Sequence, residues 1–236
     1  MQALIMKTRN PLDLVTIIAG KGPEHQQFKI HKEVCCEHSP VLKSAFTSVF
    51  IEGRTQTYKL DDASPEAVRL LCGWLYAQQL DIESAAKLWT AETFPKKFNE
   101  LKSLVELWIL AGKLLLPRLQ NLAINTIKEY THAMKAAKGV LVLGAWNPLG
   151  YYHGLVAVAE QLYNNTAEGS PLRLLCIEDL SRLIVVEPGF FAKTRKNLPN
   201  ELTCDILAFI TTSGPMETVA SQIFISPESS LEVPEN

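Results

Sequence analysis

The residues with the clearest potential for chemistry are two histidines and two cysteines in the segment 31–38. His31, Cys35 and His38 stand at steps of four and three, so on a helix they would share one face, with Cys36 adjacent. Imidazole and thiolate are ligands that zinc prefers, and adjacent thiols suit redox chemistry. Three ligands on one short helix rarely close a tetrahedron, however, and no second Cys/His pair lies nearby in the sequence. We therefore favour small buried cysteines, with His31 bonded to backbone groups, and expect no metal site.

Catalysis has little support in the sequence. No nucleophile, base and orienting acid occur together in a motif. Gly20 and Gly22 follow an apolar run, as in a dinucleotide-binding loop, but the third glycine is absent and another strand pattern follows, which indicates a hairpin turn. An enzyme in the C-terminal half would need convergent polar groups between residues 151 and 210, where the patterns are those of ordinary helix cores. We expect no enzyme and no cofactor.

The composition indicates a globular protein and gives no sign of a nucleic-acid or membrane partner. The 236 residues are 47% hydrophobic, enough for one large domain or two small ones. The net charge is -2, and no run of Lys or Arg marks a face for nucleic acid or anionic membrane. No apolar stretch approaches roughly 18 residues, and residues 1–30 lack the features of a secretory signal. Five cysteines, two of them adjacent, suit a reducing compartment. We expect an intracellular protein, cytoplasmic or nuclear, without nucleic-acid or membrane partners.

The segment 31–38, a short helix by its pattern, is framed by strands and helices. The run LDLVTIIAG ends at a glycine-rich turn, and QQFKIH then alternates apolar and polar residues, which predicts a β-hairpin. The segment TQTYKL predicts a third strand. Ser39-Pro40 predicts a helix start, with Ser as the cap and Pro at the first helical position. The apolar stripe of that helix is predicted to run through Leu42, Ala45, Phe46, Val49 and Phe50.

Helical patterns dominate the rest of the chain. A second Ser-Pro start at residues 64–65 opens the most regular of them. Residues 83–100 are polar and contain Pro95, which predicts a long loop or insertion. Two apolar stripes, one from Ser103 and one after Pro117, predict a tight helical hairpin. Further stripes continue to about residue 212, and the polar, acidic end of the chain has too little apolar surface to pack.

This order of elements resembles a BTB/POZ domain. The residues that carry the resemblance are Asp13-Leu14-Val15-Thr16, Phe28-x-Ile30-His31-Lys32, Ser39-Pro40-Val41-Leu42, Ala45-Phe46, the segment EGRTQTYKL, and Ser64-Pro65-Glu66-Ala67 leading to Trp74-Leu75-Tyr76. No single motif is specific, but their order and spacing together are. The segment LWILAGKLLLPRLQNLAINTI is similar to the helical pair that closes such domains. The helical part after Thr131, above all GLVAVAEQLYNNTAEGSPLRLL, resembles the extension of a large group of fungal BTB proteins.

The resemblance implies an α+β fold, in which a short-stranded sheet covered by helices is followed by an all-α extension. We expect the BTB/POZ domain over residues 10–131, the extension over 132–212 and a flexible tail over 213–236. The implied function is non-catalytic protein–protein interaction, as a substrate adaptor for a cullin-type ubiquitin ligase. The alternative is a homo-oligomerising scaffold or a transcription-linked regulator without a ligase role. No Kelch, zinc-finger or MATH domain is recognisable to name the pathway.

Phe50 and Glu52 are the candidate partner-binding residues. Phe50-Ile51-Glu52 stands where family members that dock onto a cullin scaffold carry a hydrophobic residue, any residue and Glu. A bulky apolar side chain can enter a groove on a partner helix while the carboxylate pairs with a base at its rim. The alternative is that Phe50 completes the stripe of its own helix, four residues after Phe46, and that Glu52 is a solvated loop charge.

Asp13, Lys32, Cys35 and Cys36 are the candidates for a dimer interface. Asp13 and Lys32 match positions that form a charged pair near the dimer groove in family members that regulate transcription. Such a pair can fix the register of an interface with little net stability, or simply support the fold. A homodimer through the first helix is the family's commonest association. Cys35 and Cys36 replace the larger aliphatic and small residues usual there, so the resemblance does not extend to the tightness of that interface.

Overall fold

The computed structural model describes residues 10, 12–82, 94–141, 149–186, 189, 192 and 195–212. The chain divides into two compact units, the first made of residues 1–83 and 106–122, the second of 84–105 and 123–236. Both units therefore draw on the same pair of long helices. The predicted tail over 213–236 lies outside the described residues.

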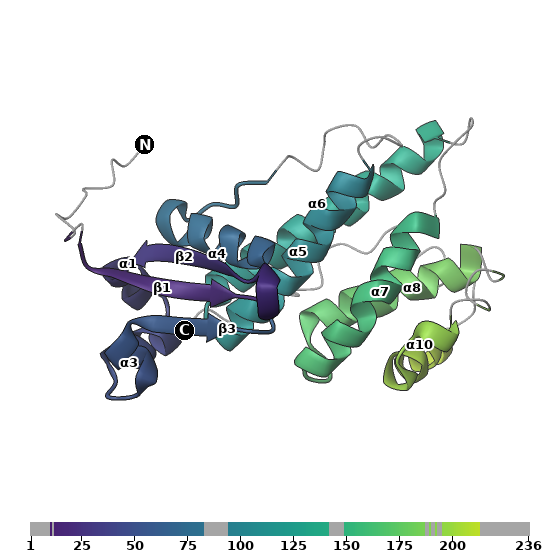
Figure 1. Cartoon of the computed structure of the whole chain (residues 1–236). Helices are drawn as coiled ribbons and strands as arrows, with labels where there is room; N and C mark the ends of the chain where they lie inside the picture. The colour runs from purple at the N-terminus through teal and green to yellow at the C-terminus, as the bar shows by residue number, and fades with distance from the viewer. Residues whose placement is uncertain are drawn as a thin grey trace. The chain divides into compact units, whose positions relative to one another are not determined.

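The first unit contains a three-stranded sheet in the order β2-β1-β3 (Figure 1). The strands are β1 (Leu14–Ala19), β2 (Gln26–His31) and β3 (Thr57–Leu60). β1 pairs antiparallel with β2 and parallel with β3, so the predicted hairpin and third strand are confirmed. Alternate residues of β1 are buried, as expected for a sheet with one covered face: Val15, Ile17 and Ala19.

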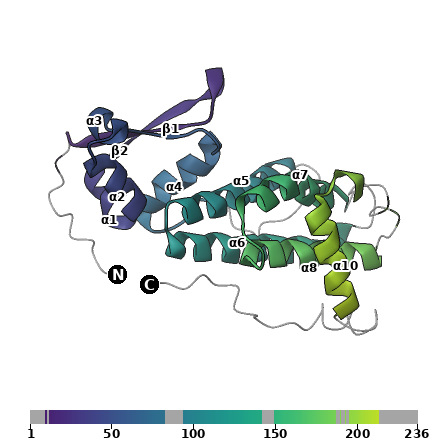
Figure 2. The ribbon, with the colours of Figure 1, turned by 90° about the horizontal axis from the view of Figure 1, so that it is seen from below.

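Helices cover the buried face of this sheet. They are α1 (Lys32–His38), α2 (Pro40–Thr47), α3 (Ile51–Thr55), α4 (Pro65–Ala77) and the parts of α5 (Phe94–Lys113) and α6 (Pro117–Leu141) that belong to the unit. Both predicted Ser-Pro starts are confirmed, because the Ser39 and Ser64 side chains each accept a hydrogen bond from a backbone N–H of the first turn. α1 packs against α2 and α4, and Figure 2 shows α1 and α2 side by side.

The helix that begins at Pro40 is shorter than its apolar stripe predicts. α2 ends at Thr47, and a separate five-residue helix, α3, begins at Ile51. The Ser48 hydroxyl donates to the Ala45 carbonyl at 2.9 Å and accepts from the Phe50 N–H at 3.3 Å. These local bonds offer the backbone an alternative to the next helical turn, so the stripe prediction is wrong beyond Thr47.

The predicted loop over residues 83–100 is wrong in its last part. α5 begins at Phe94, so residues 94–100 are helical. The prediction took Pro95 as a sign of a loop. Proline is tolerated in the first turn of a helix, however, because the backbone N–H groups there have no intrahelical acceptor.

The secondary-structure elements described in the second unit are all helices. Besides parts of α5 and α6 it contains α7 (Leu149–Asn165), α8 (Pro171–Val186), the short 3-10 helix η2 (Arg195–Asn197) and α10 (Asn200–Thr212). α8 packs against both α7 and α10. An α+β part followed by a helical part is therefore the observed architecture, as predicted.

Ser39 links two helices of the first unit. Its hydroxyl is fully buried, caps α2 by accepting from the Leu42 N–H at 3.1 Å, and donates to the Leu114 carbonyl at 2.8 Å. Leu114 follows the last residue of α5, where carbonyl groups lack helical partners. One side chain thus satisfies both a helix start and a helix end.

Arg173 has the same role in the second unit. Its buried guanidinium donates to the carbonyls of Tyr163 and Thr166, at 2.7 and 2.6 Å, and so caps the C-terminal end of α7. It also pairs with Glu201 of α10 at 2.6 Å and lies 4.1 Å from the centre of the Tyr163 ring. The Tyr163 hydroxyl in turn donates to Asp205 of α10 at 2.8 Å. We call these five residues the Arg173 cluster; it joins α7, α8 and α10.

Ser39→Ala should lower the free energy of unfolding by about 2–3 kcal/mol, because α2 loses its cap and the buried Leu114 carbonyl loses its donor. Urea denaturation followed by circular dichroism measures the change. Thr47→Ala is the control, since its exposed hydroxyl bonds only within α2 and should cost less than about 0.5 kcal/mol. Equal losses in the two variants would contradict the role of Ser39.

Arg173→Lys should lower the free energy of unfolding by about 2–4 kcal/mol although the charge is kept, because an ammonium cannot reach two carbonyls and a carboxylate from one plane. The same denaturation assay applies. Arg195→Lys, at an exposed position in η2, should change the free energy of unfolding by less than about 0.5 kcal/mol. If Arg173→Lys left the free energy of unfolding unchanged, the positive charge alone, and not the planar set of guanidinium N–H donors, would hold the Arg173 cluster together.

Candidate protein-interaction site

Three consecutive apolar side chains are exposed at the turn between α2 and α3. Val49 is 85% exposed, Phe50 71% and Ile51 62%. Phe50 precedes α3 as its N-cap residue and does not extend α2, so it does not complete the buried stripe of that helix. Adjacent exposed apolar side chains are uncommon on globular proteins outside interaction surfaces.

Gly53 packs closely against the residues that precede this turn. A Cβ atom at Gly53 would overlap the Ser48 carbonyl oxygen and would lie 3.2 Å from that of Ala45. α3 can therefore fold back against the end of α2 only with glycine at this position. Gln56, in the left-handed conformation after α3, donates from its side-chain amide to the Phe46 carbonyl at 3.1 Å and holds the two helices together. Gly53 was not predicted from the sequence, where its only local signal is a glycine two residues after an apolar run.

A groove of about 460 Å³ lies beside Phe50 within the first unit. Its lining residues come from α2, the α2–α3 turn, α3, β3 and the turn between α5 and α6: Pro40, Val41, Ser44, Ala45, Ser48, Phe50, Glu52, Tyr58 and Leu115. Glu52 is the single charged residue of this lining, and it makes no ion pair within the described part of the chain. The structure thus places the two predicted residues, Phe50 and Glu52, on one groove.

Leu115 is a second apolar side chain on this groove that sequence reasoning missed. It is 60% exposed, and its φ of 54° is unfavourable for a residue with a branched side chain. The turn between α5 and α6 imposes this conformation, because the N–H groups of Leu115 and Leu116 bond back to the carbonyls of Gly112 and Ala111. Strain held at an exposed apolar residue suggests a role in contact with another molecule.

The candidate dimer residues lie around the start of α1. The Lys32 N–H donates to the Asp13 carbonyl at 2.9 Å, a backbone link that joins β1 to α1, while no side-chain ion pair forms between these two described residues. Cys36 is half-buried and within electrostatic range of both, whereas Cys35 is fully buried.

Burial keeps these thiols protonated. It raises the pKa of Cys35 to about 12, with smaller contributions from Cys36 and Cys72, and raises the pKa of Cys72 to about 12 as well. Burial also raises the pKa of Cys36, against the opposing effect of Lys32. At neutral pH these side chains are therefore small apolar groups and not nucleophiles.

The two histidines of this segment contact α4 and not each other. His31 Nδ1 lies 2.8 Å from the Tyr76 hydroxyl, which also accepts from the His31 backbone N–H at 3.0 Å, so the expected bond from the ring to backbone groups is wrong. His38 Nε2 lies 3.2 Å from the side-chain amide of Gln78. Among the residues that the structure describes, no three His, Cys, Asp or Glu side chains gather as a metal site would require.

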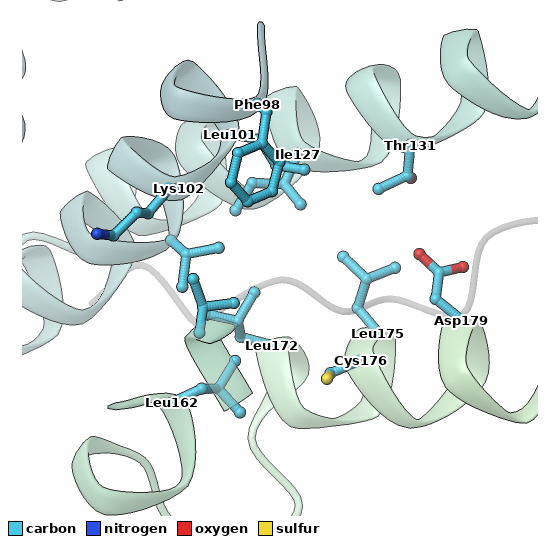
Figure 3. Close-up of a pocket in the computed structure, with 12 residues that line it drawn as sticks. Phe98, Leu101, Lys102, Ile127, Thr131, Leu162, Leu172, Leu175, Cys176 and Asp179 are labelled. Carbon is cyan, nitrogen blue, oxygen red and sulfur yellow. The ribbon is translucent and has the colours of Figure 1, made fainter. Parts of the chain in front are cut away.

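The second unit contains a small cavity of about 20 Å³ (Figure 3). α5, α6, α7 and α8 contribute its walls, which are mainly aliphatic, with Asp179 and Thr131 toward one end of the view. This volume holds about one water molecule, so the cavity is a packing gap and too small for a substrate. No helix in the described ranges is long and apolar enough to cross a membrane.

The sheet, its covering helices and the exposed α2–α3 turn define a protein-interaction domain. The family model of the BTB/POZ domain matches residues 9–129, slightly more than half of the chain, and the protein therefore belongs to the BTB/POZ family. A search of curated proteins found no match. BTB/POZ domains are protein–protein interaction modules, generally without catalytic activity, so this chain carries a module that binds other proteins.

Gly53→Ala should destabilise the first unit by about 1–3 kcal/mol, because the new methyl group can be accommodated only if α3 moves away from Ser48. Gly73→Ala in α4 is the matched control. A Cβ there meets nothing within 4 Å, so this change should stabilise the protein by about 0.5–1 kcal/mol through helix propensity. Thermal denaturation of both variants tests the pair, and a harmless Gly53→Ala would show that the turn is adaptable.

Proposed function

We propose that this protein is a substrate adaptor of a cullin-type ubiquitin ligase and docks on the cullin scaffold through Phe50 and Glu52. The observation that carries the proposal is the 71% exposure of Phe50 at the rim of a groove whose single charged lining residue is Glu52. An apolar anchor beside an unpaired carboxylate is suited to a partner helix that presents an apolar side chain and a nearby cation.

The groove supports a helix as the partner element. Leu115 and Phe50 offer two apolar contacts on the same groove, and Val41, Ala45 and Tyr58 supply further apolar surface between α2 and β3. Large side chains in a groove that excludes water dominate the energetics of such interfaces. Glu52 adds orientation, because a cation on the partner can meet it in only one register.

The alternative is a homo-oligomeric scaffold or transcription-linked regulator that pairs through α1. The outward side of α1 carries the exposed Glu33 and Glu37, with Lys32 and Cys36 half-buried beside them. The centres of stable interfaces are depleted in charge, and a two-fold pairing would bring the same carboxylates close to their copies. The charge on α1 favours the adaptor over the scaffold, although Asp13 and Lys32 remain the candidates for the rim of a dimer.

The proposal assigns the BTB/POZ domain to residues 10–131 and the helical extension, of the type found in fungal BTB proteins, to residues 132–212. An adaptor needs a second surface for its substrate, and the extension is the part of the chain available for it. The protein would act in the cytoplasm or nucleus, where cullin ligases work.

Phe50→Ala should weaken binding to the cullin scaffold by about 2 kcal/mol, or about thirtyfold, while changing the free energy of unfolding by less than about 0.5 kcal/mol. Glu52→Lys should abolish detectable binding, because the partner's cation would then face a like charge. Isothermal titration of the purified full chain with the N-terminal domain of a cullin measures both.

Val49→Ala is the matched control, since Val49 is as exposed as Phe50 but does not line the groove. Light scattering on the same samples reports the oligomeric state. No binding by the folded wild type, together with a dimer in solution, would replace the adaptor with the scaffold or regulator.

A further inference from the structure

β3 has one open edge. It is an outer strand of the sheet, and its bonds to β1 use alternate residues: the Thr16 N–H donates to the Gln56 carbonyl at 2.9 Å and the Gly20 N–H to the Leu60 carbonyl at 3.1 Å. In a parallel ladder the residues between them turn their N–H and C=O groups away from the neighbouring strand. Thr57 and Lys59 therefore present their backbone groups at the open edge. Within the described chain, no other backbone group bonds to them.

A second groove of the first unit, of about 490 Å³, lies beside this edge, between β3 and α3. Ile51, Glu52 and Thr55 line it from α3, and Thr57, Tyr58 and Lys59 line it from β3. Ile51 provides an exposed apolar surface. Glu52 lies on the α3 side, so the charge next to the strand edge itself is that of Lys59.

The charges around this groove select the kind of partner. Lys59 and Arg54 are exposed and form no ion pair among the described residues. An outward lysine on a short edge strand discourages pairing with a second copy of the same edge, because each copy brings its own cation. The same lysine attracts a strand that carries carboxylates.

We propose that the open edge of β3 binds an extended segment of a protein partner in which acidic and β-branched residues alternate. The segment adds a fourth strand to the sheet through the N–H and C=O groups of Thr57 and Lys59. Its carboxylates pair with Lys59, and an apolar side chain covers Ile51. This surface differs from the groove of Phe50 and Leu115, although Glu52 and Tyr58 border both.

The test uses the full chain and a fluorescein-labelled octapeptide of alternating Asp and Val, with an octapeptide of alternating Lys and Val as the comparison. Fluorescence polarisation at low salt should show saturable binding of the acidic peptide alone. Hydrogen exchange followed by NMR should show that the amide protons of Thr57 and Lys59 become protected on binding, which a merely electrostatic attraction would not cause.

Two variants distinguish the contribution of the Lys59 charge to binding from that of the Lys59 backbone N–H. Lys59→Gln should weaken binding about two- to fivefold, as expected for an exposed charge pair. Lys59→Pro also removes an edge N–H, which an outer strand tolerates, and should weaken binding about tenfold or more. Lys29→Gln on β2 and Phe50→Ala should each leave the affinity unchanged.

The proposal is overturned if the folded wild type shows no saturable binding, if the two amides stay unprotected, or if Lys29→Gln weakens binding as much as Lys59→Gln. If Phe50→Ala loses cullin binding but keeps peptide binding, the cullin and the peptide bind at different surfaces. The proposal for the cullin and the proposal for the β3 edge can therefore be refuted independently.

Discussion

The proposed interaction surface of this protein depends on the close approach of Gly53 to the Ser48 carbonyl. Because no side chain fits there, α3 folds back against the end of α2, and the chain between them turns outward. Ser48 and Gln56 hold this turn with side-chain bonds to three backbone carbonyls and one N–H. The apolar side chains of Val49, Phe50 and Ile51 lie exposed on this turn.

One five-residue helix thereby separates two surfaces of different chemistry. On one side, Phe50 and Leu115 flank a largely apolar groove with a single carboxylate. On the other, the open backbone of β3 and Lys59 border a groove that is more polar. A partner helix suits the first and an extended segment suits the second, because only the second offers unpaired backbone groups. The charged outer side of α1, by contrast, fits neither kind of apolar contact.

Buried polar side chains join helices within each unit. Ser39 joins the start of α2 to the end of α5, and the Arg173 cluster joins α7, α8 and α10 through backbone carbonyls and two carboxylates. The bonds to backbone groups satisfy helix ends that would otherwise be buried without a partner. The cysteines contribute as small apolar groups, since burial holds the pKa of Cys35, Cys72 and Cys176 at about 12.

The sequence by itself determined the strands, the Ser-Pro helix starts and the family, because alternation, capping residues and motif order are local signals. The sequence also identified Phe50 and Glu52 as candidate binding residues. It did not determine whether Phe50 is buried, because a helical pattern of apolar residues is the same whether its last residue packs in the core or binds a partner. Only the tertiary structure decided that α2 stops at Thr47 and that Leu115 lies on the same groove as Phe50. The end of α2 depends on the short-range bonds of Ser48 and the close packing of Gly53. The shared groove depends on the approach of the α5–α6 turn to α2, two segments distant in sequence, which no local pattern encodes.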